Sequence, residues 1–221
     1  PIPTPGHDLE PIEVLDAYLI PVQENDYDVL LKVQNPNPKH GSSNVQYEMK
    51  FFNDQEKLLA THEDTFYILP GQTRFVLITP LELPDTVARA DVEVTSIQWQ
   101  ELDVVGMRGV SLIADADSFL EEKTAGVYGR VTGSVINNSD FDVNEVDVIV
   151  IVSDGDDQPI AVNKKTINTF IAHTTRGFEA TWYSELPGDP VRTYAEAHTN
   201  IFENSTFLQR HGQFEPFQDF Y

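Results

Sequence analysis

The chain has 221 residues, no cysteine and a formal net charge of −22, which arises from 14 Lys and Arg against 36 Asp and Glu. A field this negative repels phosphate backbones and anionic lipid, so nucleic acid and direct binding to a membrane surface are disfavoured as functions. The absence of cysteine excludes disulfides, thiolate zinc sites and cysteine nucleophiles. With 40% hydrophobic and 10% aromatic residues, both halves of the chain have the composition of folded domains.

The chain begins with a proline-rich segment. Residues 1–12 include PIPTPGHDLEP, whose prolines disfavour helix and interior strand and favour an extended stalk, although a frayed terminus fits the same pattern. Because the chain opens on Pro1 and not on Met, we expect that a preceding signal peptide or membrane anchor is missing. No run of 18 apolar residues occurs, so the sequence predicts no membrane-spanning helix.

The first half then reads as a series of short strands. Val14–Ile20 is apolar and ends at Pro21, as is typical of an edge strand. Tyr27–Val33 and Val45–Phe51 alternate apolar and polar residues, the pattern of antiparallel strands with one buried face. Further strands are predicted over residues 57–60, 73–79 and 87–100.

A degraded copy of this series begins about 102 residues later. Strands are predicted over residues 110–114, 127–136, 145–153, 160–162, 175–183 and 193–202. Asn35-Pro36-Asn37-Pro38 is matched by Asn137-Asn138-Ser139-Asp140, and a strand closes on Asp54 in one copy and on Asp154 in the other. The strongest helical stretch, Asp117–Lys123, is long enough for one turn only.

We therefore predict an all-β protein made of two tandem immunoglobulin-like, seven-stranded antiparallel β-sandwiches. The expected boundaries are a stalk over residues 1–12, sandwiches over 13–101 and 102–208, and a C-terminal tail over 209–221. The tail carries four aromatic residues, Phe214, Phe217, Phe220 and Tyr221, which are too apolar to leave idle in water. We predict that they bind a partner protein, or alternatively that they fold back on the second sandwich.

Two groups of immunoglobulin-like modules resemble these repeats. Val33-Gln34-Asn35-Pro36-Asn37-Pro38 and the Leu69-Pro70-Gly71 turn are similar to the water-stress, late-embryogenesis-abundant type. Val131-Thr132-Gly133-Ser134-Val135-Ile136-Asn137 followed by Val152-Ser153-Asp154-Gly155 resembles the FxLYD type, with Val150 and Ser153 where that type has Phe and Tyr. The resemblance implies membrane-anchored or secreted modules without catalytic residues.

Motifs that carry chemistry are scarce. No Gly-x-Ser-x-Gly elbow, zincin motif or phosphate-binding glycine loop occurs, so we predict that the chain is not an enzyme. Weak calcium candidates are Asp154, Asp156 and Asp157, whose oxygens suit Ca²⁺ but lack EF-hand spacing, so a plain acidic turn is the alternative, and no other cofactor is predicted. Asn204-Ser205-Thr206 matches the glycosylation pattern.

Two functions from different classes fit these features. The first is an extracytoplasmic structural or adapter module of a cell-envelope or surface assembly, secreted, periplasmic or at the cell surface, which docks other proteins and meets the membrane only through the missing anchor. The second is a carbohydrate- or ligand-binding module that uses exposed aromatics as stacking platforms, with Tyr18, Trp99, Trp182 and Tyr183 as candidates.

Overall fold

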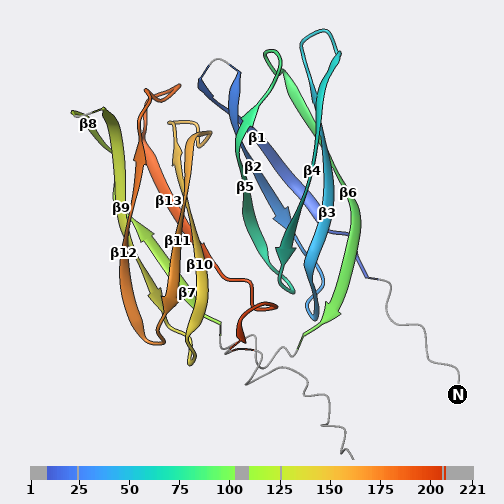
Figure 1. Ribbon diagram of the computed structural model, residues 1–221, viewed down its shortest axis with the longest axis vertical. Coiled ribbons are helices and arrows are strands. Elements are labelled where there is room, and N and C mark those ends of the chain that lie inside the picture. Colours follow the sequence, from blue (N-terminus) through green and yellow to red (C-terminus); the bar gives the residue numbers. More distant parts are fainter. Residues whose placement is uncertain (1–8, 24, 103–109, 125, 206, 208–221) are drawn as a thin grey trace, which may run out of the picture. The chain divides into compact units, whose positions relative to one another are not determined.

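The computed structural model describes residues 9–23, 25–102, 110–124, 126–205 and 207. These residues form an almost entirely β structure with four antiparallel sheets, which confirms the predicted fold class. The chain divides into two compact units, with the main division between Leu102 and Asp103. Each unit contains two of the four sheets (Figure 1).

The first unit contains six strands among its described residues. They are β1 (Glu13–Gln23), β2 (Asp26–Gln34), β3 (His40–Phe52), β4 (Leu58–Ile68), β5 (Thr73–Glu82) and β6 (Arg89–Glu101). One sheet has the order β1-β2-β5 and the other the order β4-β3-β6. Seven strands were expected, and no seventh strand occurs in the described part of this unit.

The core of the first unit lies between its two sheets. Alternation along β2 and β3 places one apolar row of each strand inward, and these rows are almost completely buried: Val29, Leu31 and Val33 on β2, and Val45, Tyr47, Met49 and Phe51 on β3. Most core residues of the edge strands are less deeply buried, although Ile68 on β4 is fully buried. The two central strands therefore carry most of the hydrophobic stabilisation of this unit.

The second unit repeats this arrangement. Its strands are β7 (Leu112–Ala116), β8 (Leu120–Thr124), β9 (Val127–Asn137), β10 (Val143–Ser153), β11 (Pro159–Phe170), β12 (Thr174–Trp182) and β13 (Arg192–His198). The sheet orders β12-β9-β7 and β11-β10-β13 correspond strand for strand to those of the first unit, with β8 added. The repeat in the sequence is thus a repeat in topology.

The helical turn expected over Asp117–Lys123 is wrong, because the chain there forms strand β8. Leu120 and Glu121 pair with Arg130 and Gly129 of β9. Main-chain hydrogen bonds to the free end of β9 are available to this segment, and they outweigh the weak helical propensity of a single turn.

One buried asparagine fastens three backbone segments together in the first unit. Asn35, at the end of β2, is fully buried. Its Nδ2 donates to the carbonyl oxygens of His40 (2.7 Å) and Leu69 (2.9 Å), and its Oδ1 accepts from the backbone N–H of Asn37 (3.0 Å). Asn37 in turn donates to and accepts from the backbone of Glu10.

The second unit uses the same device at the equivalent position. Asn137 is also fully buried, and its Nδ2 donates to the carbonyl oxygens of Phe141 (3.2 Å) and Phe170 (3.0 Å). Its Oδ1 accepts from the backbone N–H of Ser139 (3.0 Å), and the Ser139 hydroxyl accepts from the backbone N–H of Ser111 (2.9 Å). We call this arrangement, centred on Asn35 or Asn137, the asparagine latch.

The β3–β4 and β10–β11 turns are also repeated, but with a different pairing from the one expected. Asn53, and not Asp54, corresponds to Asp154, because each accepts two backbone N–H groups from its own turn. Glu56 and Asp157 both have positive φ, 58° and 61°, and both form ion pairs with an arginine, Arg89 and Arg192 respectively. The turn thus depends on a side-chain oxygen that either Asn or Asp can supply.

The latch predicts a large effect for the substitution Asn35→Ala. It would remove the hydrogen bonds to the Leu69 and His40 carbonyls and the one from the Asn37 N–H, so the free energy of unfolding should fall by about 3 kcal/mol. Urea denaturation would measure the change. In the control Asn138→Ala, which removes an exposed side chain, the loss should stay under about 0.5 kcal/mol. Equal effects of the two substitutions would contradict the role of the latch.

Candidate functional site

The outward face of the β4-β3-β6 sheet is polar, in contrast to its core-facing side. Three glutamates lie directly opposite one another across it: Glu48 on β3 is the register partner of both Glu63 on β4 and Glu93 on β6. Like charges at directly opposed positions destabilise a sheet. This glutamate row is therefore a costly arrangement for the isolated unit, and it would favour a positively charged neighbour.

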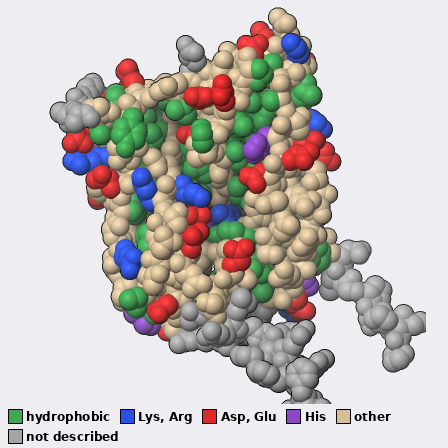
Figure 2. Space-filling model, in the orientation of Figure 1, with side chains coloured by type: hydrophobic (Ala, Val, Ile, Leu, Met, Phe, Trp, Pro, Cys, Tyr) green, Lys and Arg blue, Asp and Glu red, His purple; other side chains and the backbone are tan. Residues whose placement is uncertain are grey.

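Basic residues beside the row are already engaged with acids. Lys50 forms an ion pair with Glu48 (2.5 Å), and the hydrogen bond and charge of Glu48, together with Glu93 and Asp91, raise the pKa of Lys50. Arg89 pairs with Glu56 and Asp91, and its hydrogen bond lowers the pKa of Glu56. Figure 2 shows the same mixture more widely, with many Asp and Glu side chains and fewer Lys and Arg on the visible face.

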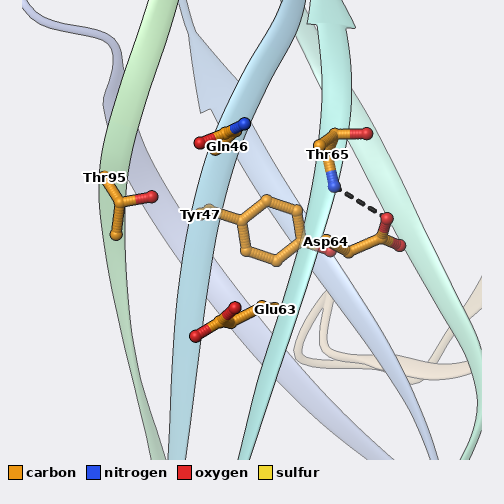
Figure 3. Close-up of a pocket in the computed structure, with 6 residues that line it drawn as sticks. All are labelled: Gln46, Tyr47, Glu63, Asp64, Thr65 and Thr95. Atoms are coloured by element: carbon orange, nitrogen blue, oxygen red, sulfur yellow. Dashed lines mark hydrogen bonds between the residues drawn. The ribbon is translucent and has the colours of Figure 1, made fainter.

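A hollow of about 510 Å³ adjoins the glutamate row (Figure 3). Its lining residues come from β3, β4 and β6 and are Gln46, Tyr47, Glu63, Asp64, Thr65 and Thr95. Thr95 lies at a shift in the register between β3 and β6, where β6 has one residue more than its partner. Such bulges bend a strand and redirect its side chains, which accounts for the hollow at this point of the sheet.

Tyr47 is the most deeply buried residue of the lining. Only 1% of it is exposed, its ring packs against Phe66 with centroids 5.6 Å apart, and its hydroxyl has no hydrogen-bond partner among the described residues. Burial, and then the charge of Asp64, raise the pKa of Tyr47 above its ordinary value. The Asp64 carboxylate itself accepts the backbone N–H of Thr65 (2.7 Å).

The chemistry available at this face is hydrogen bonding and attraction of positive charge. The lining of the hollow offers amide, hydroxyl and carboxylate groups. In the described part of the chain, no group of three or more His, Cys, Asp or Glu side chains could hold a metal ion. The face is thus suited to binding a polar or cationic group.

The weak calcium candidates lie in the β10–β11 turn and have structural partners. Oδ1 of Asp154 accepts the backbone N–H groups of Asp156 and Gln158, both at 2.9 Å, and Asp157 pairs with Arg192. The turn is held by these contacts in the same way as the β3–β4 turn, so its acids have an explanation that involves no metal. The predicted partner-binding residues Phe214, Phe217, Phe220 and Tyr221 lie outside the described residues.

Of the four aromatic residues considered as stacking platforms, Tyr183 alone is exposed. It is 75% exposed, whereas Tyr18 and Trp99 are half-buried, with Trp99 against the core of the first unit. Trp182 packs against Phe119, with ring centroids 5.7 Å apart. Tyr183 is thus the one residue of the four that offers an open ring to a ligand.

Asn204, in the predicted glycosylation pattern, is 1% exposed. Its Oδ1 accepts the backbone N–H of Phe207 (3.0 Å). The amide that would carry a glycan is therefore buried and the side chain is engaged in the fold. In the described residues, no helix is long and apolar enough to cross a membrane.

Sequence reasoning missed the glutamate row and the hollow. Glu48, Glu63 and Glu93 are far apart in the sequence, and only the strand register brings them together. The alternation of polar residues along β3 and β6 showed that these side chains face outward, but not which residue lies opposite which.

No protein-family model matches the chain, and no curated protein sequence matches it. The resemblance to the FxLYD and late-embryogenesis-abundant types therefore stays a prediction.

The unpaired Tyr47 hydroxyl predicts that Tyr47→Phe raises the free energy of unfolding by about 1 kcal/mol, because it removes a buried polar group that has no partner. The pKa of Tyr47 is higher in the folded than in the unfolded chain, so the wild type should lose further stability relative to the variant above about pH 10, where the unfolded tyrosine ionises. Urea denaturation at pH 7 and pH 10.5 would measure both effects. A destabilised variant would contradict this account.

The glutamate row predicts that Glu63→Gln stabilises the protein by about 0.5 kcal/mol at low salt, because it removes one of the opposed charges. The gain should disappear in 1 M NaCl, where the screening length falls to about 3 Å. Urea denaturation at both salt concentrations would check this. The control is Glu101→Gln, at an exposed position opposite His40, which should show no salt-dependent gain.

Proposed function

We propose that the chain is a non-catalytic extracytoplasmic structural or adapter module of a cell-envelope or surface assembly, which docks other proteins. The observation that carries the proposal is the use of buried polar side chains. In both units a buried asparagine, Asn35 or Asn137, holds backbone segments in place. Two sandwiches of the same topology, each fastened in the same way, suit a role in presenting surfaces.

Other features agree with this role. The polar face of the first unit, with its glutamate row and hollow, offers amide, hydroxyl and carboxylate groups for binding. The proline-rich start of the chain suits a stalk that holds the units away from a membrane anchor. The aromatic tail supplies a second surface for a partner. Immunoglobulin-like modules of the two types that the sequence resembles would have the same role.

A ligand-binding role is the second candidate, and the exposed ring of Tyr183 is the observation that favours it. Binding to sugars by this route needs aromatic faces in the open, and Trp99 and Trp182 are packed against other residues. The adapter role is therefore preferred.

The adapter role predicts that removing residues 209–221 abolishes or strongly weakens association with the partner assembly, because the tail then no longer supplies its aromatic contacts. The full chain and a variant ending at residue 208 would be expressed in the source organism, and their sedimentation in cell-envelope extracts compared. The full chain should sediment in a large complex and the shortened chain alone. A full chain that sediments as a monomer, like the shortened one, would contradict the proposal.

A further inference from the structure

The edge of β6 differs from the other sheet edges of the first unit. β6 pairs with β3 on one side, and in the described part of the chain no strand is hydrogen-bonded to its other side. An unpaired edge presents a row of main-chain donors and acceptors to which another strand can be added.

The other three edges carry features that discourage such pairing. β1 contains Pro21 and β5 contains Pro80, which have no N–H to donate. β4 places His62 and Asp64 opposite Met49 and Tyr47, so polar side chains stand on its core-facing side. Inward-facing charges and prolines are the usual protection of natural sheet edges.

β6 has neither feature on its core-facing side. Every core-facing residue of β6 is apolar, and each is only partly buried: Ala90, Val92, Val94, Ile97 and Trp99. Their partners on β3, such as Met49 opposite Val92 and Phe51 opposite Ala90, are completely buried. The core of the first unit is thus left incompletely covered along β6, as expected where a neighbouring strand is lacking.

The second unit shows how the equivalent edge is covered. β13, the counterpart of β6, lies alongside β7, and the Thr193 hydroxyl donates to the carbonyl oxygen of Asp117 (2.7 Å) just beyond β7. In the first unit β1 approaches β6 far less closely. The β6 edge is therefore less covered than its counterpart in the second unit.

Charge on the outward side of β6 indicates what kind of strand fits. Before the bulge at Thr95, the outward residues are Arg89, Asp91 and Glu93. Asp91 already pairs with Arg89, whereas Glu93 belongs to the glutamate row. Cross-strand pairs of opposite charge stabilise a sheet, and like charges directly opposite destabilise it. A strand added at this place would gain from lysine or arginine on its outward face and apolar residues on its inward face.

We propose that the β6 edge over Arg89–Val94 is a docking site for an extended segment of a partner protein in which apolar and basic residues alternate. The segment extends the β4-β3-β6 sheet by one strand, covers the half-buried row Ala90, Val92 and Val94, and neutralises the glutamate row. The inference rests on the docking role proposed above and names the kind of partner.

The test uses the full chain and a fluorescein-labelled nine-residue peptide in which Lys and Val alternate, with binding followed by fluorescence anisotropy. Two control peptides are used. In the first the same lysines and valines stand in separate blocks, and in the second Glu replaces each Lys of the alternating sequence. The protein variants Glu93→Lys on β6 and Glu63→Lys on β4 are matched, because both positions are exposed and both lie opposite Glu48. Each variant makes the same change in net charge.

The alternating Lys peptide should bind the wild type, and Glu93→Lys should weaken that binding about three- to tenfold while Glu63→Lys leaves it nearly unchanged. Amide hydrogen exchange over residues 89–94 should slow when the peptide is bound. Ala90→Lys on β6 and Ala60→Lys on β4 form a second matched pair, because both positions lie opposite Phe51. Ala90→Lys should abolish peptide binding, and Ala60→Lys should not.

Equal losses in Glu93→Lys and Glu63→Lys would overturn the proposal, because binding would then follow net charge and not the β6 edge. Equal binding of the block peptide or the Glu peptide, or no binding of the alternating Lys peptide, would also overturn it. So would a dimer of the wild-type chain that Ala90→Lys dissociates, because the β6 edge would then bind a second copy of the chain. In each of these cases the tail-truncation experiment still decides the adapter role independently.

Discussion

A buried asparagine at the end of a central strand is the contact on which each unit depends. Where β2 and β9 leave their sheets, the backbone must change direction inside the protein, and its carbonyl and N–H groups there lose contact with water. Asn35 and Asn137 supply both donors and an acceptor at that point, so each satisfies backbone groups from segments more than thirty residues apart. The strand end, the following loop and a distant turn are thereby fixed together.

Other side chains also bond to backbone groups at equivalent positions of the two units. Arg74 and Arg176 both donate to carbonyl oxygens of the preceding strand and lie over an aromatic ring, Tyr67 and Phe170 respectively. The β3–β4 and β10–β11 turns, each held by a side-chain oxygen and paired with an arginine, are a third repeated feature. These polar residues thus stabilise loops in both units.

Most strands and the repeat could be predicted from the sequence, because particular residues mark them. Alternation along Tyr27–Val33 and Val45–Phe51 predicted β2 and β3, since a half-buried strand needs that period. The Asn35 and Asn137 pair marked the repeat, because the side chain that ends the strand is needed in both copies. The strand β8 was missed, because its pairing depends on a free end of β9 that no local pattern reveals.

The candidate site was less accessible. Outward-facing residues can be recognised from their spacing, but the glutamate row depends on the register of three strands, and that register includes a bulge at Thr95. The openness of β6 depends on the absence of a neighbour in the described residues, which is a fact of topology and not of composition. Binding surfaces of this kind arise from the assembled sheet, so a single chain segment carries little sign of them.

The asparagine latch holds the loop after the central strand as firmly as the core is held. The most direct measurement is native-state hydrogen exchange at the backbone amides of Asn37 and Ser139, which donate to Asn35 and Asn137. The account predicts that both amides exchange as slowly as those of the central strands, by global opening of their unit. Exchange at the rate of exposed loop amides would contradict it.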